Sequence, residues 1–265
     1  LMSPFAERAY YKPLGIPGDY LMMEMLYEDH DKGESLFARL INRYFCGVAA
    51  ARSVMGRIPY ILNRINKIIE RTPRGGGPVE ITSVGSGPVK EIQDLIRAGK
   101  KSDLCHIHLV DMVLESLWYF HSKIDGLMHA TGSKIRVEYL NRTVQKLIRD
   151  QNVFPQLKGQ DLIYSFGLFD YLPFHIAKEV IEKLYQLLSD KGELIIGNFS
   201  LSNPSRYHME YVGDWYMIHR SSAELFYMAE EICPSSQVTV ESDENGVQLY
   251  LCIKNEPNKT SVAVR

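Results

Sequence analysis

The sequence predicts an α/β protein: a Rossmann-like, mainly parallel sheet with helices on both faces, closed by an antiparallel C-terminal hairpin and preceded by a helical extension. Three observations favour this fold class. From residue 79 onward, short apolar runs alternate with helical patterns, which is typical of parallel strands joined by helices. A glycine turn, Gly85-Ser86-Gly87, follows the first run. Near the end, Asn245-Gly246 lies between two strand patterns, which is a strong hairpin signal.

Composition narrows the class of protein. The chain has 265 residues, 45% of them hydrophobic, and a formal net charge of −2. We expect one large domain with an extension and no binding of nucleic acid. The four cysteines are scattered, which argues against a zinc site or disulfide framework and favours a reducing cytosol. Because the sequence shows neither a bilayer-spanning stretch nor a signal-peptide pattern, we expect a cytoplasmic protein without stable membrane insertion.

Residues 1–77 are expected to form the helical extension. A Pro-Gly turn is followed by Asp19, which can cap a helix over residues 21–26. Further helices are expected to begin near residues 34 and 49. The glycine-rich segment 74–78 is the expected joint, so that residues 78–265 form the sheet domain.

Basic residues dominate between Arg39 and Arg74, where there are eight arginines or lysines and a single acid, Glu70. A solvated helix face explains such an imbalance. A docking surface for an acidic protein partner also explains it, and both interpretations stay open.

The sheet domain is expected to contain strands and helices in alternation. Apolar, often β-branched runs predict the strands, and periodicity with capping residues predicts the helices. The expected strands are 79–84, 105–110, 134–140, 161–165, 193–198, 238–242 and 247–253. The expected helices are 91–96, 114–121, 174–188 and 221–232, with Asp190-Lys191-Gly192 as the stop of the third. Ligands of such sheets bind at the carboxyl ends of the strands.

The glycine turn, Asp111 after the second strand and the C-terminal hairpin together resemble class I S-adenosylmethionine-dependent methyltransferases over residues 79–254. That family has an acidic-x-Gly-x-Gly-x-Gly pattern in its first loop and an antiparallel seventh strand. Gly85 and Gly87 match the first two glycines, whereas Ser83 stands at the acidic position and Val89 at the third glycine. The resemblance implies a seven-stranded class I methyltransferase sheet and an enzyme that uses S-adenosyl-L-methionine and releases S-adenosyl-L-homocysteine.

The resemblance also implies where the cofactor binds. Asp111 would hold both ribose hydroxyls, because a carboxylate can accept two hydrogen bonds; a helix-capping aspartate is the alternative. The glycine turn would seat the methionine part, Asn141 would contact adenine, and the helical extension would fold over the cofactor. The expected cofactor-binding residues are Asp19, Tyr20, Gly85, Ser86, Gly87, Pro88, Asp111, Met112, Asn141, Ser165, Phe166 and Gly167.

A substrate cover is expected at about residues 199–220. Its segment 203–220 combines aromatic side chains with a few charges, which suits a mostly apolar pocket; an amphipathic helix packed on the sheet is the alternative. This segment and residues 12–23 resemble a bacterial methyltransferase group that includes the quorum-sensing synthases of 3-hydroxy fatty acid methyl esters. The expected substrate-binding residues are Phe169, Asp170, Tyr207, Glu210, Tyr211, Asp214, Trp215 and Arg220, and the expected catalytic residues are Tyr171, His175 and Arg206.

Arg206 and Arg220 amid aromatics favour an anionic acceptor on an apolar tail. We therefore predict O-methylation of a carboxylate on a hydrophobic small molecule, such as a 3-hydroxy fatty acid. A carboxylate has an unperturbed pKa of about 4 and is a nucleophile near neutral pH, whereas a hydroxyl acceptor would need a general base. Hydroxyl methylation, a nicotinamide-dependent oxidoreductase and a cofactor-binding module without catalysis are the alternatives.

No metal site is expected. His106 and His108 are two residues apart on a strand and share a face, but no carboxylate or third ligand is near in sequence. The sequence also contains no P-loop and no Gly-x-Ser-x-Gly motif.

Overall fold

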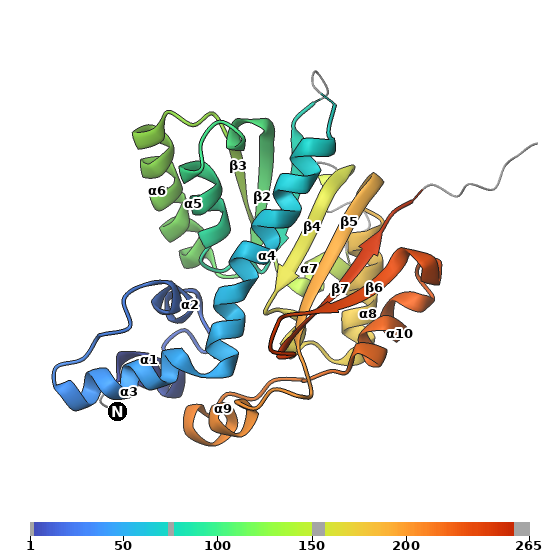
Figure 1. The fold of residues 1–265 in the computed structure, drawn as a ribbon. Coiled ribbons are helices and arrows are strands. Elements are labelled where there is room, and N and C mark those ends of the chain that lie inside the picture. The colour runs from blue at the N-terminus through green and yellow to red at the C-terminus, as the bar shows by residue number, and fades with distance from the viewer. Residues whose placement is uncertain (1–2, 74–76, 150–156, 257–265) are drawn as a thin grey trace, which may run out of the picture.

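Seven strands form one mixed sheet in the order β3-β2-β1-β4-β5-β7-β6 (Figure 1). The computed structural model describes residues 3–73, 77–149 and 157–256. Strands β1 to β5 are parallel, and β7 runs antiparallel to both β5 and β6. The strands are β1 (Val79–Val84), β2 (Cys105–Asp111), β3 (Arg136–Asn141), β4 (Gln160–Phe166), β5 (Leu188–Phe199), β6 (Val238–Ser242) and β7 (Gln248–Lys254). The predicted fold class is therefore confirmed, including the antiparallel hairpin.

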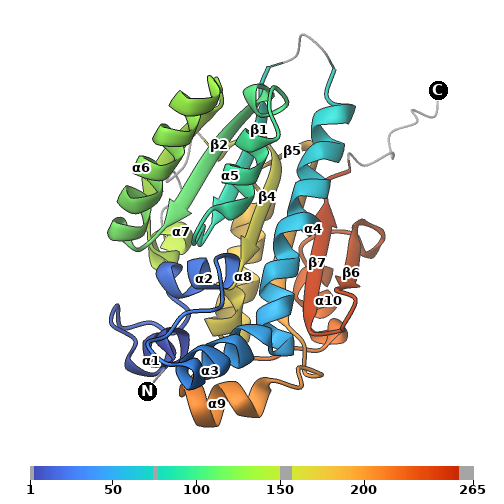
Figure 2. The ribbon, with the colours of Figure 1, turned by 60° about the vertical axis from the view of Figure 1, so that its left-hand side comes forward.

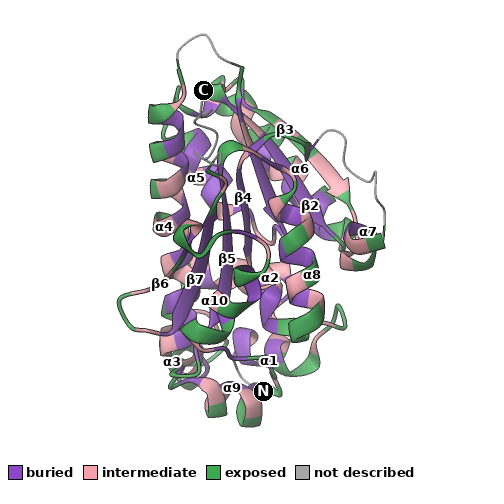
Figure 3. Cartoon of the chain, turned by 90° about the vertical axis from the view of Figure 1, so that its right-hand side faces the viewer, coloured by how far each residue is buried: buried purple, intermediate pink, exposed green. Residues whose placement is uncertain are grey.

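Helices cover both faces of the sheet, which explains why its central strands are apolar in continuous runs. Helices α4, α5 and α6 pack on one face, and α7, α8 and α10 on the other (Figures 1 and 2). Strands β1 and β4 are buried along most of their length, and β5 is buried from Gly192 onward (Figure 3). The helices of this part are α4 (Ala49–Arg71), α5 (Lys90–Arg97), α6 (Leu114–Thr131), α7 (Val144–Arg149), α8 (Phe174–Tyr185) and α10 (Ser222–Glu230).

The remaining helices gather at one end of the sheet. They are α1 (Pro4–Tyr11), α2 (Tyr20–Tyr27), α3 (Leu36–Gly47) and α9 (Arg206–Gly213), and together with the start of α4 they share an apolar cluster (Figure 2). Asp19 caps α2 as predicted, since its Oδ1 accepts the N–H groups of Leu21 and Met22 at 3.0 Å. The sequence patterns did not predict α1 or α7.

The boundary between α8 and β5 differs from the prediction. The helix expected over 174–188 ends at Tyr185, and β5 begins at Leu188 rather than at Glu193. The expected stop, residues 190–192, lies inside β5, where the pairing with β4 shifts register between Gln160 and Leu162. Lys191 has a φ of 69° there, so this turn-like sequence forms a bulge within the strand.

Several basic residues of the 39–74 segment are used inside the molecule. Arg57 is buried, and Arg64 contacts Glu193 and Glu241. The predicted joint at 74–78 lies partly outside the described residues. Within the described part of the chain, no helix is long and apolar enough to cross a membrane.

Candidate functional site

A cavity of about 610 Å³ opens at the carboxyl ends of β1, β2 and β4. Its walls come from the loops after these strands, from α4 and from the turn that leads into α2. The predicted site residues that line it are Asp19, Tyr20, Gly85, Ser86, Gly87, Pro88, Asp111, Met112, Phe166, Gly167, Asp170, Tyr171 and Trp215. This cavity is the expected ligand position in a sheet of this kind.

The glycine turn and Asp111 face each other at the edge of the cavity. Gly85 and Gly87 have φ values of 66° and 55°, a conformation that glycine adopts without a steric penalty. The Asp111 carboxylate accepts the N–H of Gly87 at 3.3 Å and that of Val113 at 2.9 Å. Burial raises the pKa of Asp111, although these backbone donors act in the opposite direction. The carboxylate is thus held in place beside the turn, with 9% of the residue exposed.

Val89, which stands where the sequence pattern of the family would have a third glycine, has a left-handed backbone. Its φ and ψ are 44° and 35°, in the left-handed region, which is unusual for a β-branched residue. Its side chain is buried in the core of the sheet. The backbone at Val89 is therefore locally strained.

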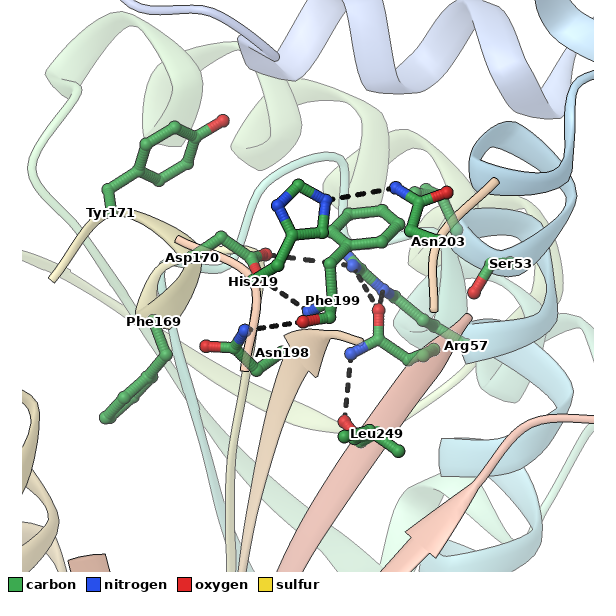
Figure 4. A network of polar contacts seen from close by, with 12 residues as sticks. Ser53, Arg57, Phe169, Asp170, Tyr171, Asn198, Phe199, Asn203, His219 and Leu249 are labelled. Atoms are coloured by element: carbon green, nitrogen blue, oxygen red, sulfur yellow. Dashed lines mark hydrogen bonds and ion pairs between the residues drawn. The ribbon is translucent and has the colours of Figure 1, made fainter. Parts of the chain in front are cut away.

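Among the described residues, Arg57 is the one arginine or lysine in the cavity wall, and the sequence patterns did not reveal it. It extends from α4 and is only 6% exposed. Its Nε donates to Gln248 Oε1 at 2.9 Å, and its Nη2 lies 3.9 Å from Asp170 Oδ2. Figure 4 shows this group beside Phe199, over whose ring the guanidinium carbon lies at 5.1 Å. The Nη1 atom has no hydrogen bond within the described residues and points to Gly167, where an added Cβ would lie 3.5 Å away.

Asp170 is a structural partner of Arg57. Its Oδ1 accepts the Phe199 N–H at 2.7 Å, and burial raises its pKa, with Arg57 acting in the opposite direction. A second buried acid in the cavity wall, Glu91, accepts the Tyr164 hydroxyl at 2.6 Å. Burial raises the pKa of Glu91 too. Neither Arg57 nor Glu91 stood out in the sequence, because each lies in an ordinary amphipathic helix.

The two segments predicted to form a cover do meet. Lys12 Nζ and Asp214 Oδ2 lie 2.6 Å apart. The Trp215 indole packs so closely on Gly18 that an added Cβ there would lie 2.5 Å from its Cζ2. Trp215 lines the cavity together with Asp19 and Tyr20, so residues 12–23 and 203–220 share one wall.

Other predicted site residues do not line the cavity. Asn141 donates to the backbone oxygens of Asp111 and Met112 at the end of the sheet. Arg206 pairs with Glu210 on α9, and Arg220 is buried among the carbonyl groups of the loop after β4. The predicted residues outside the cavity wall are Asn141, Ser165, Phe169, His175, Arg206, Tyr207, Glu210, Tyr211, Asp214 and Arg220.

Comparisons with known proteins bear on this fold. No protein-family model and no curated protein matches the chain. A possible exported protein from Bordetella parapertussis is similar in structure, with 15% identity, a TM-score of 0.61, and 90% of this chain and 80% of that chain covered. Magnesium protoporphyrin IX methyltransferase from Synechocystis with bound SAH has 12% identity and a TM-score of 0.57, and the match covers 94% of this chain and 98% of that one. An O-methyltransferase family protein from Burkholderia thailandensis has 11% identity and a TM-score of 0.55, covering 96% and 72%.

At these identities the similarity establishes the fold. The chain has the seven-stranded fold of S-adenosylmethionine-dependent methyltransferases, as the sequence predicted. Because one fold hosts many functions, activity has to be argued from the cavity itself.

Proposed function

We propose that this protein is an S-adenosylmethionine-dependent methyltransferase. The observation that carries the proposal is the Asp111 carboxylate, held beside the Gly85–Gly87 turn at the edge of the cavity. A carboxylate in this position can accept both ribose hydroxyls of a nucleoside. The turn leaves room for a ligand to approach the backbone. The structural similarity to a methyltransferase with bound SAH supports the same ligand.

The residues of the chain would bind the cofactor and the acceptor, hold them in the orientation that methyl transfer needs, and exclude water. The sulfonium methyl of bound S-adenosylmethionine is already activated for transfer. Asp111 and Met112 would hold the ribose, the Gly85–Gly87 turn the methionine part, and Phe166 and Gly167 would lie beside the acceptor. The product is S-adenosylhomocysteine.

The acceptor in this proposal is a carboxylate on a hydrophobic small molecule. The sequence patterns assigned the orienting cation to Arg206 or Arg220, but in the proposal Arg57 takes this role. Its guanidinium lies in the cavity wall, and its Nη1 faces the side where Gly167 leaves space. A guanidinium can hold a carboxylate through charge-assisted hydrogen bonds.

The lining of the cavity supports an apolar acceptor body. Besides its few polar groups, the wall is built from aliphatic and aromatic side chains, among them Met23, Ile58, Ile61, Ile176 and Met217. Behind Val54, Phe199 and Trp215 lies a small second pocket of about 40 Å³, whose lining is mainly apolar. An acyl chain, such as that of a 3-hydroxy fatty acid, would suit these surfaces; this acceptor and the link to quorum sensing stay predictions.

Hydroxyl methylation is the second candidate. It requires a general base, and no histidine in the described residues lines the large cavity. His175, the base that the sequence suggested, lies outside its wall. Of the acids in the wall, Asp19 is paired with Arg8, Asp170 with Arg57 and Glu91 with Tyr164. The remaining wall acid, Asp111, is assigned to the ribose in this proposal. A carboxylate is therefore the preferred acceptor. A measurement of turnover distinguishes a methyltransferase from a cofactor-binding module without catalysis.

Two further expectations belong to the proposal. The four cysteines are all free and buried, which suits a cytoplasmic protein. Docking of an acidic protein on the basic 39–74 face stays a prediction, on a surface reduced by the internal roles of Arg57 and Arg64.

The test is product analysis with labelled S-adenosylmethionine and a panel of hydrophobic carboxylic acids and phenols. Mild base hydrolyses a methyl ester and leaves a methyl ether intact, so we expect a base-labile product. We expect Arg57→Gln to lower turnover at least tenfold, with partial recovery in Arg57→Lys, whereas Arg206→Gln retains activity. A base-stable product, or loss of activity in Arg206→Gln with Arg57→Gln unaffected, would overturn the carboxylate assignment. Absence of turnover with every acceptor while SAH binds would favour the non-catalytic module.

A further inference from the structure

Outside the cavity, four titratable side chains gather on one face of β1, β2 and β3. Glu80 belongs to β1, His106 and His108 to β2, and Glu138 to β3. The strand register places Glu80 opposite His106 and His108 opposite Glu138. The neighbouring residues Ile81, Ile107 and Leu109 point into the core under α4, α5 and α6, so the four side chains lie on the other face.

We infer that Glu80, His106 and His108 bind a divalent transition metal such as Zn²⁺, with Glu138 as the outer carboxylate that orients both imidazoles. The site is separate from the proposed function. It lies near the amino-terminal halves of the strands, whereas the cavity lies at their carboxyl ends. From Glu80 to the end of β1 the chain rises roughly 13 Å, at about 3.3 Å per residue.

The ligand atoms converge as a metal requires. Glu80 Oε2 lies 3.0 Å from His106 Nδ1 and 3.0 Å from His108 Nε2. One ligand atom from each of the three residues lies within 4.8 Å of the others. Zinc bonds of about 2.0–2.2 Å to nitrogen and oxygen in a tetrahedral site place neighbouring ligand atoms roughly 3.4 Å apart. Small side-chain shifts would therefore admit the ion, leaving a fourth position for water.

Glu138 supplies the outer contact that metal-bound histidines usually have. Its Oε1 lies 3.3 Å from His106 Nε2, and its Oε2 lies 3.4 Å from His108 Nδ1. These are the ring nitrogens that do not face Glu80. A carboxylate that accepts the second ring N–H fixes the tautomer and orientation of a ligating imidazole.

Hydrogen bonding alone does not satisfy this cluster when the rings are neutral. A neutral imidazole carries one N–H, and its other nitrogen is an acceptor. All four ring nitrogens face carboxylate oxygens at 3.0–3.4 Å, so two of these contacts would set a lone pair against an anion. His108 is only 1% exposed, and its Nδ1 has no hydrogen bond within the described residues. A metal ion beside Glu80 removes the two unfavourable contacts. Each imidazole then binds the ion through the nitrogen that faces Glu80 and donates its N–H to Glu138.

The sequence predicted no metal here because no third ligand lies near the two histidines in the chain. The sheet supplies Glu80 from 26 residues before His106 and Glu138 from 30 residues after His108. Nitrogen and carboxylate ligands of this number are typical of zinc sites.

The experiment titrates chelator-treated full-length protein with Zn²⁺ by calorimetry, and with Co²⁺ by absorption spectroscopy. We expect one equivalent to bind, with visible bands of Co²⁺ in a low-symmetry site and a higher melting temperature. Glu80→Gln should abolish stoichiometric binding, and Glu138→Gln should weaken it by about 10- to 100-fold. The matched control is Asp125→Asn, which alters the exposed His121–Asp125 pair and should leave zinc affinity unchanged.

Two results would overturn the site: no stoichiometric Zn²⁺ binding by the wild-type protein, or wild-type affinity in Glu80→Gln. Because SAH affinity is measured separately, failure of this site and failure of the proposed function are distinguishable.

Discussion

The indole N–H of Trp215 donates to the hydroxyl oxygen of Tyr171 at 2.7 Å. The Tyr171 hydroxyl in turn donates to the backbone oxygen of Pro17 at 3.3 Å. Three segments that are far apart in the sequence, the turn before α2, the loop after β4 and the residues after α9, thus meet at the cavity wall. Burial raises the pKa of Tyr171, so its hydroxyl stays neutral and acts as both acceptor and donor.

Removing the Tyr171 hydroxyl should loosen this cover. Tyr171→Phe loses the two hydrogen bonds while keeping the ring, and a typical intramolecular hydrogen bond contributes about 1 kcal/mol. We expect SAH to dissociate about fivefold faster or more in stopped-flow measurements. Tyr207→Phe is the control, since Tyr207 is exposed on α9 outside the wall. Equal dissociation rates in the two variants would contradict a role for the Tyr171–Trp215 contact.

Substitutions at two glycines of the turn before α2 distinguish the effect of backbone strain from the effect of the contact with Trp215. Gly15 and Gly18 have φ values of 74° and 68°, but only at Gly18 would a Cβ meet another side chain, Trp215 at 2.5 Å. Both Gly15→Ala and Gly18→Ala should lower the melting temperature through backbone strain. Only Gly18→Ala should also change tryptophan fluorescence and weaken SAH binding. Identical effects of the two substitutions would show that Trp215 does not depend on this contact.

The strained backbone at Val89 gives a prediction on stability. Glycine tolerates the left-handed conformation, which costs other residues about 1–2 kcal/mol, and neither glycine nor alanine fills the space of the valine side chain. Val89→Gly should therefore be more stable to denaturant than Val89→Ala, by about 1 kcal/mol. The reverse order would mean that the backbone at this position is not left-handed in solution.

Binding of SAH should depend on the ionisation of Asp111. Burial raises the pKa of this carboxyl above the ordinary aspartate value, and the ribose hydroxyls need the ionised form as acceptor. Affinity should therefore fall as the pH drops through this raised pKa, at a higher pH than that at which an exposed aspartate titrates. Asp111→Asn should bind weakly with little of this dependence. A wild-type affinity that is flat down to the ordinary aspartate range would contradict the assignment.

The raised pKa of Asp111 also determines how the stability of the ligand-free protein changes with pH. Between the unfolded and folded pKa values the folded state binds more protons, so the contribution of Asp111 to stability decreases as pH rises through this window and is constant above it. Lowering the pH through this window should thus weaken SAH binding, but it should increase the contribution of Asp111 to the stability of the ligand-free protein.

The strands and the loops that follow them could be predicted because local chemistry specifies them. Val79–Val84 and Cys105–Asp111 are short, apolar and followed by turns or acids, and parallel strands carry their ligand groups at the carboxyl ends. This is why the sequence alone is sufficient to place Gly85, Gly87 and Asp111 together.

Residues whose roles depend on long-range packing could not be predicted. Arg57 enters the cavity because α4 crosses the sheet and brings it to Gln248 and Asp170. Conversely, α9 presents Tyr207 and Tyr211 to solvent. Of the aromatic residues in segment 203–220, only Trp215 lines both the large cavity and the small second pocket. The partners of His106 and His108 likewise follow from strand register, which the sequence near them does not contain.

Calorimetric titration of the purified protein with SAH tests the central claim most directly. We predict stoichiometric binding to the wild-type protein and an affinity at least 100-fold lower for Asp111→Ala, since hydrogen bonds to a charged group contribute about 1.5–3 kcal/mol each. Circular dichroism should show that the variant keeps its fold. No binding to the wild-type protein, or equal affinity for folded Asp111→Ala, would contradict the account.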